Sequence, residues 1–252
     1  MKLLFDNTLV QTALTIKAPI VTNSESLASR VSQVQQQISD ACARAARDPA
    51  EVTLLPVSKT FGAESIREMV ALGFRRFGEN RLQEIAQKAP ELADCDIEWV
   101  VIGHVQTNKA KEVAKYASEL QSLDRLSLAQ ALDKRLAALN RTLKVLVQVK
   151  TSPEDTKSGL EPGDLIPFLK EISRFPTLKV EGLMTMAILS DDENAVRQCF
   201  RQLRLCRDQA RDAGIDGVSL NRLSMGMSGD MALAIEEGST EVRVGTAIFG
   251  KR

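Results

Sequence analysis

The amino-acid sequence predicts an α/β protein built as a single (β/α)8 barrel. Short apolar runs with β-branched residues alternate with helical patterns along nearly the whole chain. Strands that alternate with helices form right-handed βαβ units and a parallel sheet. Eight such units in roughly 230 residues fit a closed barrel better than an open doubly wound sheet. The sequence has no internal repeat and no linker rich in Gly, Pro or Ser, so we expect one domain.

The eight predicted strands are short and regularly spaced. The first is Val52–Val57, an apolar run that contains two valines and a threonine, residues that favour a pleated strand. The other seven follow at Phe74–Phe77, Glu98–Ile102, Leu120–Leu123, Lys144–Val149, Val180–Met184, Leu220–Ser224 and Val242–Val244.

The helical segments around these strands have recognisable ends. Apolar residues between positions 27 and 45 recur every three or four residues, as on one face of an amphipathic helix. Ser127 and Gln130 have the spacing of a capping box and precede a leucine-rich helix face. Acidic residues at 191–193 suit the N-terminus of a further helix, which Gly214 is well placed to end.

Composition argues against several classes of protein. The chain has 33 Lys and Arg residues and 33 Asp and Glu residues, so its net charge is zero. Nucleic-acid-binding proteins usually carry a basic excess, so we expect no nucleic-acid partner. Four cysteines without a CxxC pair and a single histidine, His104, argue against a disulfide framework and a metal site. We therefore expect reduced cysteines, no metal and a cytoplasmic location.

The first 23 residues stand outside the barrel pattern. Asp6, Asn7 and Gln11 interrupt their apolar stretch. That stretch therefore matches neither the apolar core of a signal peptide nor the roughly 20 residues of a membrane span. We expect residues 1–23 to be a poorly ordered extension and residues 24–252 to form the barrel, without a membrane partner.

A lysine follows the first predicted strand. Reactive groups of such barrels collect where strands end and loops begin, and this strand runs into Ser58-Lys59-Thr60. A lysine at that place points toward the barrel mouth. Partial burial there favours the neutral amine, the form that attacks an aldehyde to give a Schiff base. A solvated loop lysine is the other interpretation of this position taken alone.

The ends of the last two strands have the features of a phosphate site. The seventh strand runs through Ser228 into a predicted helix that begins at Met231, and we expect Ser228 to be its N-cap. The eighth strand runs into Gly245 and Thr246, which open a short helical turn. Backbone N–H groups at helix starts, together with hydroxyls and small glycines, hold phosphate well. The loops after strands seven and eight are where barrel enzymes commonly bind it.

A phosphate site facing a Schiff-base lysine fits two classes of ligand. One is a sugar phosphate, as in a lysine-dependent aldolase, and the other is pyridoxal 5′-phosphate (PLP). Hydrophobic periodicity does not separate them.

The motifs that carry these residues resemble those of the pyridoxal phosphate homeostasis proteins. The barrel of that family is similar to the N-terminal domain of alanine racemases, so the resemblance implies a TIM-type barrel of PLP fold type III. It covers the chain from about Leu27 to the C-terminus. The matching segments are 57–60 (VSKT), 77–80 (FGEN), 102–109 (IGHVQTNK), 157–159 (KSG), 182–185 (GLMT), 223–230 (LSMGMSGD) and 237–250.

The resemblance implies a set of cofactor-binding residues. Lys59 would form the Schiff base with PLP. The cofactor phosphate would lie on Ser228, Gly245 and Thr246, with Ser224 close by.

Three further residues complete the implied pocket. Asn80 would line it, and Met184 would either pack near the cofactor ring or belong to the core. Arg243 would face the pyridine nitrogen. Because arginine only donates hydrogen bonds, it disfavours protonation of that nitrogen and so weakens the ring as an electron sink.

The same arrangement in alanine racemases is completed by a tyrosine base from a second domain. This chain ends at Arg252, directly after the eighth barrel unit, and its one tyrosine, Tyr116, falls on a predicted helix. We therefore expect a cofactor site without a second acid/base partner. His104 ends the third strand, and we expect it to make a local hydrogen bond in preference to an acid/base role.

One departure from the family pattern concerns the loop beside Lys59. Family members often carry Lys-Pro after the Ser-Lys-Thr motif, whereas this chain has Phe61-Gly62. The resemblance therefore fixes the lysine but not the contacts of the loop.

The leading hypothesis is a non-enzymatic protein of intracellular PLP homeostasis. It would hold PLP as a Schiff base on Lys59, supply it to PLP-dependent apoenzymes and act as a monomer. The alternative is an enzyme, either a weak PLP-dependent amino-acid racemase or another small PLP enzyme. A sugar-phosphate aldolase is the third candidate.

Overall fold

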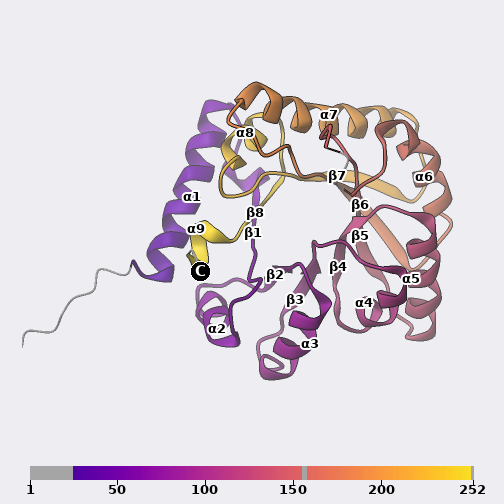
Figure 1. Cartoon of the computed structure of the whole chain (residues 1–252), viewed down its shortest axis with the longest axis horizontal. Coiled ribbons are helices and arrows are strands. Elements are labelled where there is room, and N and C mark those ends of the chain that lie inside the picture. The colour runs from indigo at the N-terminus through magenta and orange to yellow at the C-terminus, as the bar shows by residue number, and fades with distance from the viewer. Residues whose placement is uncertain (1–24, 155–157, 251–252) are drawn as a thin grey trace, which may run out of the picture.

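A computed structural model shows the chain folded as a barrel of strands surrounded by helices (Figure 1). The structure describes residues 25–154 and 158–250. The predicted N-terminal extension, residues 1–23, lies outside the described residues.

Eight parallel strands make one sheet, in the order β1-β8-β7-β6-β5-β4-β3-β2. They are β1 (Thr53–Pro56), β2 (Arg76–Glu79), β3 (Glu98–Val101), β4 (Glu119–Leu123), β5 (Leu143–Gln148), β6 (Leu178–Met184), β7 (Val218–Ser224) and β8 (Glu241–Val244). A parallel bridge between Val57 and Gly78 joins the two edges, and Ser58 N donates to Gly78 O at 3.1 Å. The sheet is therefore a nearly closed barrel, and the predicted fold class is confirmed.

The largest displacement of a predicted strand is at β2. The sequence predicts Phe74–Phe77, whereas the strand is Arg76–Glu79. Phe74 lies in the turn after the second helix, where its N–H donates to Met69 O, and its ring packs against the core from that turn. An apolar side chain contributes to the core equally well from a turn, so hydrophobicity placed the strand two residues early.

The helices cover the outside of the strands (Figure 1). They are α1 (Leu27–Arg44), α2 (Ala63–Ala71), α3 (Leu82–Glu91), α4 (Ala110–Tyr116), α5 (Leu126–Ala138), α6 (Leu165–Ile172), α7 (Glu193–Asp212), α8 (Met231–Glu236) and α9 (Thr246–Phe249). Short 3-10 helices span Pro49–Glu51, Thr107–Lys109 and Pro162–Asp164. Because α8 and α9 have only six and four residues, α1 packs against both and completes the wall on that side.

The predicted ends of α7 are confirmed, whereas the predicted capping box of α5 is wrong. Asp192 caps α7 by accepting a hydrogen bond from Asn194 N (2.9 Å), and Gly214 follows its last turn with φ +56°. Helix α5 begins at Leu126, so Ser127 already lies inside it. Arg125 holds the N-cap position there, and its side chain is bound to Asp124 (2.6 Å) and to a backbone carbonyl, which fixes where the helix starts.

An ion-pair cluster fills the barrel at the end where the strands begin. Arg76 and Arg222 each bind both Glu119 and Glu241, at 2.7 to 3.0 Å. The four side chains come from β2, β7, β4 and β8, which can meet only across the barrel interior. Both carboxylates are almost fully buried. A buried carboxylate is strongly destabilising unless it is paired. The barrel is therefore stable only when its strands bring these arginines and glutamates together.

The cluster predicts that the barrel is weakened by acid. Burial alone disfavours the Glu241 carboxylate, but Arg222 and Arg76 outweigh it, and the pKa of Glu241 lies below its ordinary value. A depressed carboxyl pKa contributes stability above the unfolded value of about 4.3, and this is lost as pH falls through the folded pKa. We expect the urea midpoint to fall between pH 7 and about pH 3.5, and to fall less in Glu241→Gln. Equal falls in both proteins would show that Glu241 is not part of the acid response.

Further features bear on the expected partners. No helix within the described residues is long and apolar enough to cross a bilayer. No group of three or more metal-ligating side chains occurs in the described ranges. The cysteines Cys42, Cys95, Cys199 and Cys206 are buried and free.

Candidate functional site

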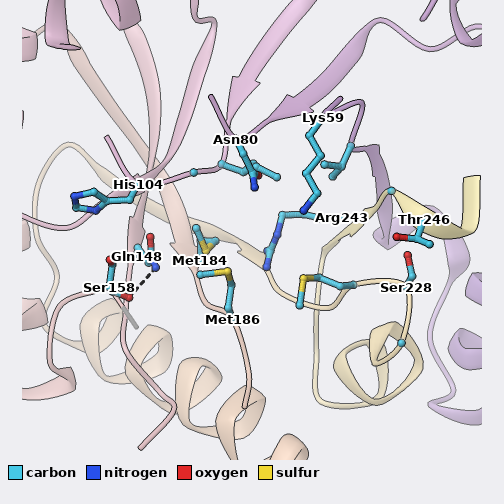
Figure 2. Close-up of a pocket in the computed structure, with 16 residues that line it drawn as sticks. Lys59, Asn80, His104, Gln148, Ser158, Met184, Met186, Ser228, Arg243 and Thr246 are labelled. Atoms are coloured by element: carbon cyan, nitrogen blue, oxygen red, sulfur yellow. Dashed lines mark hydrogen bonds between the residues drawn. The ribbon is translucent and has the colours of Figure 1, made fainter. Parts of the chain in front are cut away.

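A pocket of about 390 Å³ opens at the barrel end where the strands finish (Figure 2). This volume is typical of sites for small ligands. The lining comes from the segments that follow β1, β2, β3, β5, β6, β7 and β8. The lining residues are Val57, Lys59, Asn80, Ile102, Gly103, His104, Gln148, Ser158, Met184, Met186, Met227, Ser228, Gly229, Arg243, Gly245 and Thr246.

Lys59 lies three residues beyond the buried end of β1 at Pro56. It is half-buried, and Figure 2 shows its side chain extending into the pocket toward Arg243. Its Nζ has no hydrogen-bond or ion-pair partner within the described part of the chain. The next residue, Thr60, has φ +68°, a left-handed conformation that is unfavourable for a residue branched at Cβ. The amine is therefore uncommitted, but the backbone that carries it is strained.

Two hydroxyl side chains form the other end of the pocket. Ser228, after β7, and Thr246, at the start of α9, lie close together in Figure 2, with Gly245 between β8 and Thr246. Ser228 Oγ accepts a hydrogen bond from Ala247 N (3.4 Å), which leaves its O–H free to donate into the pocket. These are the residues predicted for the phosphate.

The predicted role of Ser228 as a helix cap is wrong. Helix α8 begins at Met231 and its N-cap position is Asp230, whose carboxylate accepts from Met227 N. Ser228 lies two residues too early and is bound instead across the loops to Ala247 N. The hydroxyl therefore joins the loop after β7 to the loop after β8, an arrangement that local sequence patterns do not report.

Arg243 is the buried cation of the pocket. It is 4% exposed, and its guanidinium donates to Ser224 Oγ and to Thr185 O, both at 2.8 Å. Burial lowers the pKa of Arg243 to about 10, which still leaves the side chain charged at neutral pH. Only two of the five guanidinium N–H groups are used in this way, so others can donate to a ligand.

Ser224 does not line the pocket. It is fully buried beneath Arg243, and its hydroxyl donates to Gln121 Oε1 at 2.7 Å. The Gln121 amide in turn donates to Glu119 and Glu241 of the buried cluster. Ser224 therefore supports Arg243 from below and is not among the residues that line the pocket. A polar chain runs from the pocket floor to the opposite end of the barrel.

The remaining predicted residues, Asn80 and Met184, both line the pocket. Asn80 follows β2, where Gly103 makes room for it: a Cβ on Gly103 would lie 2.2 Å from Asn80 O. Met184 is fully buried at the end of β6 and also faces the cavity, so it belongs to both the core and the pocket.

His104 lies at the far side of the pocket from Ser228 and Thr246 (Figure 2). It is about half exposed, and its Nδ1 is 3.6 Å from Asp124 Oδ2, which is too long for a hydrogen bond, so the local hydrogen bond predicted for it stays a prediction. Tyr116 ends α4 and is not among the residues that line the pocket.

Sequence patterns had not singled out several lining residues as pocket residues. Gln148 is the last residue of β5 and donates to Ser158 O at 2.7 Å. Both had a usable signal, because Gln148 is a polar residue at a strand end and Ser158 lies in the KSG motif. Met227 lies in the 223–230 motif and so had the same kind of signal. Met186 had none, because apolar residues after strands usually belong to the core.

The segment Phe61-Gly62, which departs from the family pattern, has a clear structural role. Phe61 stacks on Phe249 of α9, with ring centroids 5.0 Å apart and planes inclined by 26°. Gly62 is the N-cap of α2. The stack joins the loop that carries Lys59 to the short helix that begins at Thr246.

Comparison with known proteins gives the chain a family. Residues 30–252 match the family described as alanine racemase, N-terminal domain. The pyridoxal phosphate homeostasis protein of Aquifex aeolicus is 42% identical over 223 residues, 88% of this chain and 97% of that protein. The protein of the same name from Escherichia coli K12 is 39% identical over 229 residues, 90% of this chain and 97% of that protein.

Solved structures agree with this relationship. An unknown protein from Bifidobacterium adolescentis is 36% identical with a TM-score of 0.85, covering 88% of this chain and 94% of that chain. PipY of Synechococcus elongatus, solved with PLP bound, is 35% identical with a TM-score of 0.80. The match covers 89% of this chain and 100% of the PipY chain. An alanine racemase of Clostridium difficile, 13% identical with a TM-score of 0.66, shares the fold and is covered over 56% of its length. The chain therefore belongs to the pyridoxal phosphate homeostasis protein family, whose barrel is that of the alanine racemase N-terminal domain.

Proposed function

We propose that this protein binds PLP in the pocket at the barrel mouth and takes part in PLP homeostasis. One observation carries the proposal: a single pocket joins an uncommitted lysine, a buried arginine and two hydroxyls, and no acidic residue is among the described residues that line it. A dianionic phosphate suits a site with two cations and no carboxylate. The name of the Aquifex aeolicus relative and the PLP bound to PipY support the same ligand.

The residues present fit the parts of PLP. Ser228 and Thr246 offer hydroxyl donors for the phosphate. A Cβ on Gly245, directly before Thr246, would lie only 3.1 Å from Val57 O, so a side chain there would crowd the loop. Arg243 has donors left for the pyridine nitrogen. Lys59 extends into the same space from the side of β1 (Figure 2).

Lys59 would hold the cofactor covalently. PLP supplies an aldehyde, and the neutral Lys59 amine adds to its carbon. A C=N double bond forms, and the carbonyl oxygen leaves as water together with the two amine protons. Arg243 would keep the pyridine nitrogen unprotonated, because a guanidinium donates hydrogen bonds and accepts none. The site is therefore suited to holding PLP and poorly suited to stabilising a carbanion.

We propose a carrier in preference to an enzyme. A racemase needs a second acid/base group, and Tyr116 at the end of α4 is not among the residues lining the pocket. His104 lies across the cavity from the phosphate end, beside Asp124. The relatives are named as homeostasis proteins. In this proposal the protein acts in the cytoplasm as a monomer and releases PLP to apoenzymes.

Transfer to an apoenzyme tests the carrier role. The loaded protein, freed of unbound PLP, would be mixed with an apo-aminotransferase in the presence of a phosphatase that destroys free PLP. We expect aminotransferase activity to return with the loaded protein and not with the same amount of free PLP. If aminotransferase activity returns in neither mixture, the protein still binds PLP, but the proposal that it supplies PLP to apoenzymes is contradicted.

A further inference from the structure

A buried charged cluster lies behind the segment that carries Lys59, on the side of α3. Lys88 and Glu84 of α3 are one turn apart, and Glu79 ends β2. Lys88 Nζ is 2.7 Å from Glu79 Oε1 and 3.2 Å from Glu84 Oε2. The Lys88 side chain is 10% exposed and that of Glu79 is fully buried. Lysine is rarely buried so deeply unless its charge is paired, as it is here with Glu79 and Glu84.

Lys88 uses its whole hydrogen-bonding capacity on this cluster. An ammonium group has three N–H donors, and Lys88 gives the third to Ser58 O at 3.0 Å. Ser58 also donates its hydroxyl to Glu79 Oε1 at 2.7 Å. The residue before Lys59 is therefore held at both its carbonyl and its side chain. Lys88, with all three N–H groups engaged, is unsuited to attack an aldehyde itself.

Glu84 holds the residue after Lys59. Its Oε2 accepts a hydrogen bond from Thr60 N at 2.5 Å, besides the one from Lys88. Burial alone disfavours the Glu84 carboxylate, but the bonds from Thr60 and Lys88 outweigh it, and the pKa of Glu84 lies below its ordinary value. Thr60 is the residue with the unfavourable φ of +68°. A strained residue persists only where its surroundings hold it, and Glu84 supplies that restraint.

We propose that Lys88 and Glu84 are positioning residues, which clamp the backbone on either side of Lys59 so that its amine points into the pocket. This inference rests on the proposed Schiff-base role of Lys59. Neither side chain is among the residues that line the pocket. They act through the backbone of Ser58 and Thr60, so they set the rate of covalent attachment and leave the phosphate and ring contacts unchanged.

The cluster is built for geometry more than for stability. A buried ion pair is often no more stabilising than apolar side chains of similar volume. Here it leaves Glu79 Oε2 buried without a partner in the described residues. The contribution of the charged groups is positional. Three hydrogen bonds from one ammonium group hold Ser58, Glu79 and Glu84 in fixed positions relative to each other.

Two variants of the full-length protein test the proposal. Lys88→Met removes the ammonium at similar length, and Glu84→Ala removes the acceptor for Thr60 N. The controls are Lys109→Met and Glu112→Ala, a partly exposed pair three residues apart, with side chains 36% and 37% exposed and an Nζ–Oε1 distance of 3.0 Å. Each protein is assayed for the rate of borohydride-trappable attachment of PLP. Its affinity is measured for 4′-deoxypyridoxine 5′-phosphate, which has the ring and phosphate of PLP but no aldehyde.

Misplacement of a reacting group by about 1 Å can cost on the order of a hundredfold in rate. We expect attachment to slow tenfold or more in Lys88→Met and Glu84→Ala, with affinity for the aldehyde-free analogue within twofold of wild type and both controls unchanged. Attachment at the wild-type rate in Glu84→Ala, the milder change, would overturn the proposal. So would a matching loss of analogue affinity in both variants, because it would indicate general damage to the pocket. Absence of attachment in the wild-type protein would instead contradict the proposed function itself.

Discussion

Lys59→Ala is expected to abolish covalent attachment of PLP while the protein stays folded. Lys59 is half-buried, and its amine has no partner within the described chain. Removing it should therefore change the free energy of unfolding by no more than about 0.5 kcal/mol. The attachment has no second candidate in the pocket, because no other lysine is among the described residues that line it. Borohydride reduction followed by mass measurement of the intact protein gives the trapped fraction.

The control for this variant is Lys134→Ala, at an exposed position on α5. It should trap PLP as the wild type does. Trapping on one site in Lys59→Ala would show that another lysine carries the cofactor. Peptide mapping of the trapped protein would then identify that lysine.

The double variant Ser228→Ala/Thr246→Ala is expected to lose phosphate recognition. A hydrogen bond to a charged group contributes about 2 kcal/mol, so losing two should weaken PLP binding by about a thousandfold. Affinity for pyridoxal, which has the aldehyde but no phosphate, should change little. The measurement is a pair of titrations, one with each compound, on the double variant and on Ser219→Ala, an exposed serine at the other end of the barrel.

The comparison of the two ligands gives this test its meaning. Ser228 Oγ also binds Ala247 N, so the double variant could loosen the loop for reasons unrelated to phosphate. Loosening would weaken pyridoxal and PLP alike. A phosphate site at Ser228 and Thr246 predicts that the preference for PLP over pyridoxal disappears. If that preference survives, the phosphate lies elsewhere.

The strands and many of the pocket residues were predictable because they follow from short-range patterns in the sequence. Short apolar runs with β-branched residues, regularly spaced, placed all eight strands within two residues of their positions. Once the strands form a barrel, their final residues must meet at one end. That rule predicts that Lys59, Ser228 and Thr246 lie together, whereas the place of Arg243 in the pocket came from the family resemblance.

The features that sequence did not predict all depend on contacts between distant segments. Arg76 and Glu241, 165 residues apart, pair across the barrel, and each looks like an ordinary charged residue at a strand start. Ser224 appeared to belong with the phosphate loop, but its buried hydroxyl binds Arg243 and Gln121, which is 103 residues away in the sequence. The capping box at Ser127 failed for a related reason: Arg125, at the N-cap position, donates to Val105 O, 20 residues earlier in the chain and outside the motif.

The same distinction explains the clamp behind Lys59. Lys88 and Glu84 are spaced as an ordinary exposed helix pair, which sequence alone would assign to the surface. Their burial follows from the packing of α3 beside the ends of β1 and β2, where Ser58 and Glu79 supply the other contacts. A short-range pattern therefore gives the residue types of a site, and packing decides which of them act.

The most direct test of the account is an absorption spectrum of the purified wild-type protein after addition of PLP, before and after borohydride reduction, followed by peptide mapping. The account predicts a Schiff-base band that disappears on reduction and a pyridoxyl mass on the peptide that contains Lys59. A protein that stays colourless and takes up no PLP, or a pyridoxyl mass on a different peptide, would contradict it.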